Sequence, residues 1–225
     1  GLGILALLAT MDTRGTDTRS SYQLMIIATL AFIALAFAGP FIWWHGLILL
    51  AILAYMLPSQ AKDAKAAEEV PEGADKDLSR RKIAFYLLAG IIGLPFGADI
   101  LVRGAITIAT DFGISDTVIG LTLVAIGTSL PELATTVAAA YRRQADVAIG
   151  NVIGSNMFNL LGIIGVGALF GALPVPRDFL QFDLWVMLAA SLILIPFVYY
   201  NQIMSRIWGG VLTVAYVVYL IFVLI

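Results

Sequence analysis

Apolar residues lie along this chain in long runs that are separated by short polar segments. Each of seven runs approaches or exceeds the roughly 20 residues that a helix needs to cross a bilayer. These predicted spans lie at about 21–38, 41–58, 83–110, 116–140, 148–171, 179–200 and 207–225. Residues 1–10 are apolar but too few to span, and we interpret them as the end of an eighth helix. The pattern predicts an all-α polytopic membrane protein.

The composition strengthens this interpretation and excludes several other classes. Hydrophobic residues make up 60% of the chain and charged residues only 12%, whereas a soluble domain carries about 25% charged residues. The net charge of −2 argues against a nucleic-acid partner. Without cysteine, and with His45 as the one histidine, thiolate and most histidine-based metal chemistry is excluded. Because His45 follows Trp43 and Trp44, we expect it in an interfacial aromatic belt.

The long polar segment at 59–82 is rich in Lys, Glu, Asp and Ala, and it predicts a solvated linker. If this linker is cytoplasmic, eleven of the thirteen Lys and Arg residues fall in segments on the same side. Only Arg177 lies on the other side, and Arg103 lies within a span. Basic residues concentrate in cytoplasmic loops. We therefore predict a multi-pass protein of the cell inner (plasma) membrane, with the linker cytoplasmic and the C-terminus outside.

A weak internal repeat organises the chain into two halves. The tripeptide Leu-Gly-Ile occurs at 2–4 and again at 161–163, each time followed by a polar turn and two apolar spans. The region 83–225 holds five predicted spans, and an odd number makes a duplicated half insert with inverted topology. We interpret 1–58 as the incomplete end of the first half and 59–82 as the linker. On this interpretation the chain is truncated at its N-terminus to about seven full spans plus a fragment.

Glu132 is the sharpest chemical signal, because it lies deep within the predicted span 116–140. A carboxylate at this depth costs several kcal/mol unless it is paired or functional. The alternative is a residue near a helix end whose side chain reaches water. Pro131 directly precedes it and removes a backbone donor, so carbonyl groups from Ala125 to Gly127 lose helical partners. In lipid these carbonyls need other partners, either neighbouring hydroxyls or a bound cation.

Further oxygen ligands surround this carboxylate in the sequence. Thr128 and Ser129 add hydroxyl groups directly before Pro131. In the next span, Ser155 and Asn159 are four residues apart and would share a helix face. Each of these side chains alone is more typical of helix packing. Together they supply the oxygen ligands that hard cations prefer, and they predict half of a cation site.

Asp99 and Arg103 form a second charged feature, within the predicted span 83–110. They are also four residues apart, which places them on one helix face. Charged residues within a span are rare and usually pair with one another. We therefore expect a structural ion pair.

Three segments closely resemble the second alpha-repeat of the calcium/cation antiporter superfamily, nearest to the prokaryotic sodium/calcium exchangers. They are LVRGA at 101–105, VIGLTLVAIGTSLPELATTVAAA at 118–140 and GNVIGSNMFN at 150–159. The resemblance implies an inverted-repeat exchanger fold of ten helices, in which the helix at 83–110 slides across the core.

The resemblance also implies a role for each candidate ligand. Glu132 would be the central calcium and sodium ligand, and Asn159 would hold the remaining side-chain position near the central site. The implied sodium ligands are Thr128, Ser129, Ser155 and the carbonyl group of Ala125. Two features depart from the family pattern. The first alpha-repeat, with its second glutamate, is not matched, and Asn stands at 159 where some exchangers have Asp.

The expected function is therefore exchange of sodium for calcium across the membrane by alternating access. Calcium and sodium ions and the lipid bilayer are the expected partners, no cofactor is expected, and the missing half-site would be needed to complete the ion site. The alternatives are a calcium/proton antiporter, in which Glu132 titrates, and a non-transporting fragment or subunit. An enzyme is not expected, because a hydrolase built on Ser129 would need a base that neither His45 nor a lysine within a span supplies.

Overall fold

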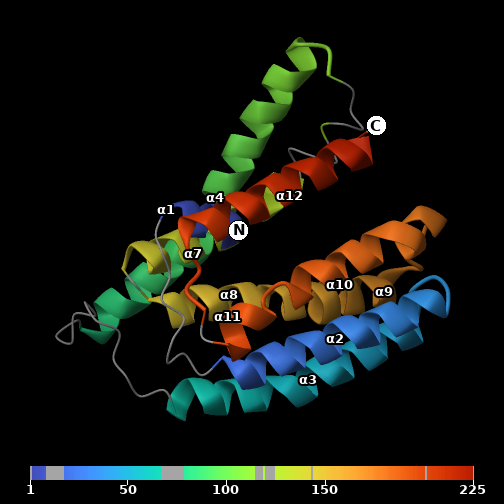
Figure 1. The fold of residues 1–225 in the computed structure, drawn as a ribbon, viewed down its shortest axis with the longest axis horizontal. Helices are drawn as coiled ribbons and strands as arrows, with labels where there is room; N and C mark the ends of the chain where they lie inside the picture. Colours follow the sequence, from blue (N-terminus) through green and yellow to red (C-terminus); the bar gives the residue numbers. More distant parts are fainter. Residues whose placement is uncertain are drawn as a thin grey trace. The chain divides into compact units, whose positions relative to one another are not determined.

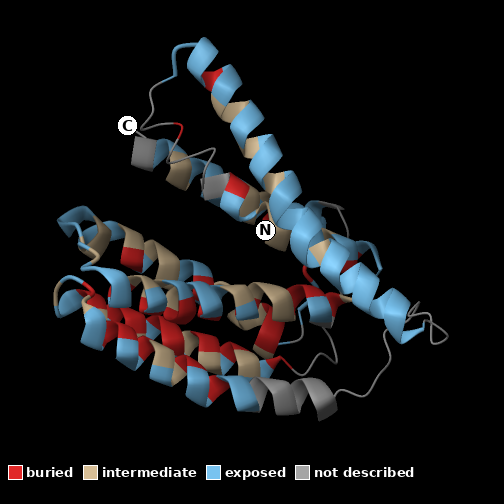
Figure 2. Ribbon diagram, turned by 180° about the vertical axis from the view of Figure 1, so that it is seen from behind, coloured by how far each residue is buried: buried red, intermediate tan, exposed pale blue. Residues whose placement is uncertain are grey.

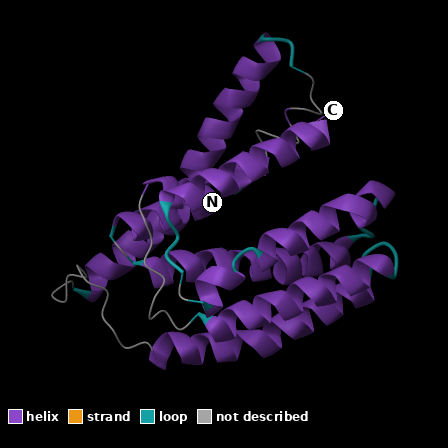
Figure 3. Cartoon of the chain, in the orientation of Figure 1, coloured by secondary structure: helices purple, strands orange, loops and turns teal. Residues whose placement is uncertain are grey.

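A computed structural model describes residues 2–8, 18–66, 79–114, 119, 125–142, 144–200 and 202–224. Figures 1 and 3 show that helices make up nearly all of this part of the chain, which confirms the predicted all-α class. The helices are α1 (Leu2–Leu8), α2 (Arg19–Phe37), α3 (Trp43–Ala66), α4 (Arg80–Asp111), α6 (Ala125–Thr128), α7 (Leu130–Tyr141), α8 (Ala145–Met157), η2 (Phe158–Ile163), α9 (Ile164–Phe170), η3 (Phe179–Asp183), α10 (Leu184–Leu192), α11 (Ile195–Tyr199) and α12 (Arg206–Leu224). Both η elements are π-helices.

The chain divides into two compact units. The first consists of Gly1–Met11, Pro71–Gln144 and Ser205–Ile225, and it contains α1, α4, α6, α7 and α12. The second consists of Asp12–Val70 and Ala145–Met204, and it contains the other helices. Each unit therefore combines segments that are far apart in the sequence.

In the second unit, α2 packs against α3 and α8, and α3 packs against η2 and α9. Figure 2 shows the buried residues gathered between these helices. Those of α2 recur every three or four positions, at Tyr22, Met25, Ala28, Thr29, Phe32, Ile33 and Ala36. The helices α3 and α9 approach closely at two glycines, because a Cβ at Gly46 would lie 2.5 Å from the carbonyl oxygen of Gly165.

In the first unit, α1 packs against α12, while α4 packs against α6 and α7. A Cβ at Gly209 would lie 2.6 Å from the backbone nitrogen of Leu7 and 2.8 Å from the carbonyl carbon of Ala6. Aligning the two Leu-Gly-Ile tripeptides makes Ala6 equivalent to Gly165. In the first unit Ala6 meets Gly209, near the start of α12. In the second unit the equivalent residue, Gly165, meets Gly46, near the start of α3. The internal repeat stays a prediction, and these matching contacts are what it would produce.

Most predicted spans agree with helices to within a few residues, and three differ. α3 continues through Pro58 to Ala66, eight residues into the predicted linker. Residues 59–66 consist largely of good helix formers, and one proline interrupts only a single helical hydrogen bond. The predicted span 116–140 is broken between α6 and α7, and its residues 116–118 and 120–124 lie outside the described part. The span 179–200 is interrupted by a turn at Ile193 and Leu194.

Four helical segments of the described chain are long and apolar enough to cross a membrane: Arg19–Phe37, Arg80–Asp111, Val147–Phe170 and Phe179–Tyr199. Trp43–Pro58 and Arg206–Phe222 are shorter apolar helices. These segments agree with six of the seven predicted spans, and the seventh is the broken segment. The sequence from 67 to 78, in the middle of the predicted linker, lies outside the described residues.

His45, the residue expected in an interfacial aromatic belt, faces the protein interior, and the belt itself stays a prediction. Its side chain is 2% exposed, and its ring packs 3.6 Å from that of Trp44. The Nδ1 atom accepts a hydrogen bond of 3.2 Å from the backbone N–H of Ile42, the residue before α3. His45 therefore satisfies one of the backbone donors that the start of a helix leaves without a partner.

Candidate cation site

A break in the helix forms the centre of the candidate site. α6 ends at Thr128, Ser129 lies in a turn, and α7 begins at Leu130 with Pro131 in its first turn. Proline suits the first turn of a helix, where its missing N–H costs nothing. In an unbroken helix the residue at 131 would donate to the carbonyl group of Gly127, and proline cannot. The predicted interruption is thus confirmed as a break of one residue, Ser129, between α6 and α7.

Glu132 lies in the first turn of α7, immediately after this break. Its side chain is half-buried, and its Oε2 atom is shielded from solvent. The start of a helix carries a partial positive charge, which favours a carboxylate at this position. The break therefore places an acidic oxygen where two helix ends meet.

Two threonines that the sequence analysis missed hold the backbone at this point. The Oγ1 atom of Thr135 donates a 2.9 Å hydrogen bond to the carbonyl oxygen of Glu132. The hydroxyl group of Thr136, which is 1% exposed, donates to the same oxygen. Hydroxyls three and four residues after a carbonyl often make this contact. The spacing in the sequence is the signal that could have found them.

The other candidates of this motif lie on the N-terminal side of the break. Thr128 and Ser129 are exposed, and the side chain of Ser129 does not cap α7. Ala125 is the first residue of α6, so its carbonyl group lies one turn before the break. Ala125, Thr128, Ser129 and Glu132 thus belong to one broken helix in the first unit.

Ser155 and Asn159 lie in the second unit, and the helix face predicted to hold both stays a prediction. Ser155 is half-buried near the end of α8, and its Oγ donates to the carbonyl oxygen of Val152 at 3.1 Å. Asn159 is exposed and lies in the π-helix η2, which begins at Phe158. The change from α- to π-helix falls between the two residues, so their spacing of four is not that of a single α-helix. Single π turns are frequent at functional sites.

The structure thus assigns the six candidate ligands to two groups. Four lie at the break in the first unit and two lie at the junction of α8 and η2 in the second. That the two groups face one another across a single cation stays a prediction.

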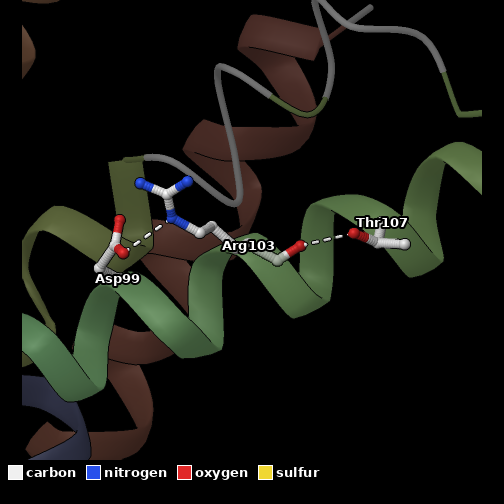
Figure 4. A network of polar contacts seen from close by, with 3 residues as sticks. All are labelled: Asp99, Arg103 and Thr107. Atoms are coloured by element: carbon white, nitrogen blue, oxygen red, sulfur yellow. Dashed lines mark hydrogen bonds and ion pairs between the residues drawn. The ribbon is translucent and has the colours of Figure 1, made fainter.

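The ion pair predicted on the span 83–110 is present on α4. The Nε atom of Arg103 lies 2.7 Å from the Oδ2 atom of Asp99, as Figure 4 shows. The backbone carbonyl of Arg103 also accepts a hydrogen bond of 2.9 Å from Thr107. The Arg103 side chain is 77% exposed and that of Asp99 is 52% exposed. The two charges therefore compensate each other on an exposed face of α4.

Several apolar helices of membrane-spanning length define a multi-pass membrane protein. A helix break beside a carboxylate is typical of ion-binding elements in membrane proteins. The family described as "Sodium/calcium exchanger protein" matches residues 82–225. That region includes both candidate motifs. The chain belongs to the sodium/calcium exchanger protein family.

Individual relatives agree with this assignment. The sodium/calcium exchanger MaX1 of Methanosarcina acetivorans is 42% identical over 154 residues, which are 68% of this chain and 42% of that protein. The inner membrane protein YrbG of Escherichia coli strain K12 is 31% identical over 204 residues, which are 85% of this chain and 62% of YrbG. The chain thus spans less than two thirds of either relative.

Solved structures show the same fold. The sodium-calcium exchanger NCX_Mj, soaked without sodium and calcium, matches with a TM-score of 0.73 and 32% identity. The match covers 96% of this chain and 69% of NCX_Mj. The predicted exchanger fold is thereby confirmed.

Proposed function

We propose that this chain is part of a secondary antiporter that exchanges sodium for calcium by alternating access. The observation that carries the proposal is the break between α6 and α7, which places Glu132 half-buried in the first turn of α7. Broken helices with polar ends are the usual ion-binding elements of transporters. In this proposal the chain is a transporter and not an enzyme, and the two cations are its substrates.

The proposed ligands are the oxygen atoms on the two sides of the break. Glu132 supplies the one negative charge, while Thr128, Ser129 and the Ala125 carbonyl supply neutral oxygens. Ser155 and Asn159 contribute from the second motif. Calcium and sodium are hard cations and bind such oxygens. Competition of the two ions for the same ligands couples their movements, because occupancy by either permits the change of access.

The chain contains a single GTSLPE motif. We therefore include in the proposal a second wall of the site, contributed by another repeat of the same protein. We further propose the cell inner membrane as the location, with residues 59–82 on the cytoplasmic side. The alternatives are a calcium/proton antiporter with Glu132 as the titrating group and a non-transporting fragment.

A flux assay tests the proposal. The complete protein that contains this chain is reconstituted in liposomes, and calcium uptake is measured with an outward sodium gradient or with a pH gradient. We expect uptake that requires the sodium gradient. Uptake that follows pH and ignores sodium would favour the calcium/proton alternative. Calcium uptake by these 225 residues reconstituted alone would refute the non-transporting fragment.

The variant Glu132→Ala tests the role of the carboxylate in the same assay. We expect loss of calcium uptake in a protein that still inserts and elutes as a single species. Asp178→Asn, which removes a carboxylate at the start of η3 in the other unit, is the control and should retain uptake. Near-normal flux in Glu132→Ala would defeat the assignment.

A further inference from the structure

Two apolar grooves flank the first half of α2, both within the second unit. One groove, of about 450 Å³, lies between α2 and α3 and is lined by residues that include Leu24, Ile48 and Tyr55. The other, of about 380 Å³, lies between α2 and the helices α10 and α11, with Leu192 and Ile195 in its lining. The grooves share Ile27, which is 53% exposed. The exposed side chain of Ile27 therefore separates the two apolar grooves.

A polar cluster lies at one end of the second groove. The Nη2 atom of Arg19 donates to the carbonyl oxygen of Tyr199 at 3.4 Å, and its guanidinium lies 5.8 Å from the centre of the Tyr199 ring. The Nε2 atom of Gln23 donates to the Tyr199 hydroxyl at 3.0 Å. This hydroxyl is an acceptor toward Gln23, so its own hydrogen can be donated elsewhere. The cluster thus joins the start of α2 to the end of α11.

The ends of two membrane-spanning segments fix the depth of this cluster. The segment Arg19–Phe37 begins at Arg19, and the segment Phe179–Tyr199 ends at Tyr199. The contacts above hold both ends together, and we infer that ends of this kind lie near the headgroup region of a bilayer. The second groove begins at this cluster, with Gln23 and Tyr199 in its lining, and reaches Ile26 and Ile27. The first groove adjoins it at Ile27.

Arg19 brings a positive charge to the described part of this cluster. No described residue that lines either groove carries a carboxylate, and Arg19 brings the cluster's guanidinium. The N-cap residue Thr18 makes no side-chain capping hydrogen bond, so its side chain does not compensate the positive end of the α2 dipole. A guanidinium has five N–H donors and suits a phosphate group.

We propose that this part of α2 binds one anionic phospholipid. Its two acyl chains lie in the two grooves on either side of Ile27, and its phosphate contacts Arg19 and the Tyr199 hydroxyl. Two chains and one charged headgroup match two grooves and one basic cluster at the depth of the interface. An anionic lipid is favoured over a zwitterionic one, because the described cluster offers no carboxylate for an ammonium group. Basic sites between spanning helices bind anionic headgroups in this way.

Lipid titration of the purified full chain in detergent tests the proposal. Phosphatidylglycerol and phosphatidylcholine with identical acyl chains are added, and bound lipid is counted by native mass spectrometry. We expect one saturable site with an apparent affinity for phosphatidylglycerol about fivefold higher, the effect of one basic residue near a membrane surface. Equal affinity for the two lipids in the wild-type protein would overturn the proposal. So would equal occupancy by glycerol 3-phosphate, since that result would show an anion site without acyl chains.

Variants separate the headgroup from the grooves. Arg19→Gln should lower the affinity for phosphatidylglycerol to that for phosphatidylcholine. Tyr199→Phe should lower the affinity for phosphatidylglycerol in part, and it serves as the second test if Arg19→Gln does not fold. Ile27→Trp, which fills both grooves, should lower the affinities for both lipids by the same factor. Arg206→Gln, at the start of α12 in the other unit, is the matched control and should keep the preference. Retention of the full preference in Arg19→Gln would refute the assignment of Arg19.

Discussion

The Cγ2 atom of Val102 occupies the place where a side chain at Gly127 would begin. A Cβ built on Gly127 would lie only 1.9 Å from it, far inside the contact distance of two carbon atoms. Val102 belongs to α4, and Gly127 lies in α6, directly before Thr128 and the turn residue Ser129. The long helix α4 therefore rests on the backbone of the candidate site, and the absence of a side chain at 127 makes this approach possible.

The variant Gly127→Ala should force α4 away from the break. Overpacking of this kind typically costs about 1–3 kcal/mol, and we expect a lower thermal midpoint together with reduced calcium uptake. The double variant Gly127→Ala/Val102→Ala removes both methyl groups of Val102, including the one that clashes, and should recover most of both properties. Thermal unfolding and the sodium-driven uptake assay measure the two effects.

Gly104→Ala is the control on α4 itself, because a Cβ there meets no atom within 4 Å. This change should leave uptake intact. If the double variant behaves no better than Gly127→Ala alone, the Val102 contact does not determine the position of α4.

Two adjacent glycines of α12 should respond in opposite ways to the same substitution. A Cβ at Gly209 would meet the backbone of α1, at 2.6 Å from the nitrogen of Leu7, whereas a Cβ at Gly210 meets nothing within 4 Å. Gly209→Ala should therefore lower the thermal midpoint. Gly210→Ala should leave it unchanged or raise it, since alanine is favoured over glycine in a helix by about 1 kcal/mol. Equal effects would mean that α1 is not held against α12 in solution.

Local sequence signals predicted much of this fold. Runs of apolar residues located the spans, Pro131 predicted the interruption before Glu132, and the spacing of Asp99 and Arg103 predicted their pair. Each signal acts within about one helical turn or within one uninterrupted span. The energetic cost of a charge or a proline in lipid makes these signals strong.

What the sequence did not predict depends on packing between segments that are distant in the chain. The contact of Val102 with Gly127 and the grooves beside Ile27 involve neighbours that no local pattern identifies. No proline or charged residue in Phe158–Ile163 predicts that this segment forms a π-helix. The joint site of Glu132 and Asn159 depends on two different units, and it stays a prediction.

Removal of one charge from the Asp99–Arg103 pair should lower the yield of membrane-inserted protein more than removal of both charges. Arg103→Leu leaves Asp99 alone on an apolar spanning helix, and Asp99→Leu leaves Arg103 alone. A lone charge in a span is costly, whereas a neutral pair is compatible with lipid. We expect the double variant to be recovered from membranes in higher yield than either single variant. Yields that fall additively would show that the two side chains do not compensate each other.

His45 should stabilise the start of α3 through both its ring and its Nδ1 atom. Its position, three residues after Ile42, is that of the Glu or Gln in a capping box, which also accepts the N–H at the helix start. His45→Ala removes the hydrogen bond and the packing on Trp44, and should cost about 2–4 kcal/mol. His45→Gln keeps an acceptor and should cost less than His45→Leu, which keeps only apolar volume. Thermal midpoints of the three purified variants test this order. A midpoint for Leu equal to or above that for Gln would show that packing alone accounts for the burial of His45.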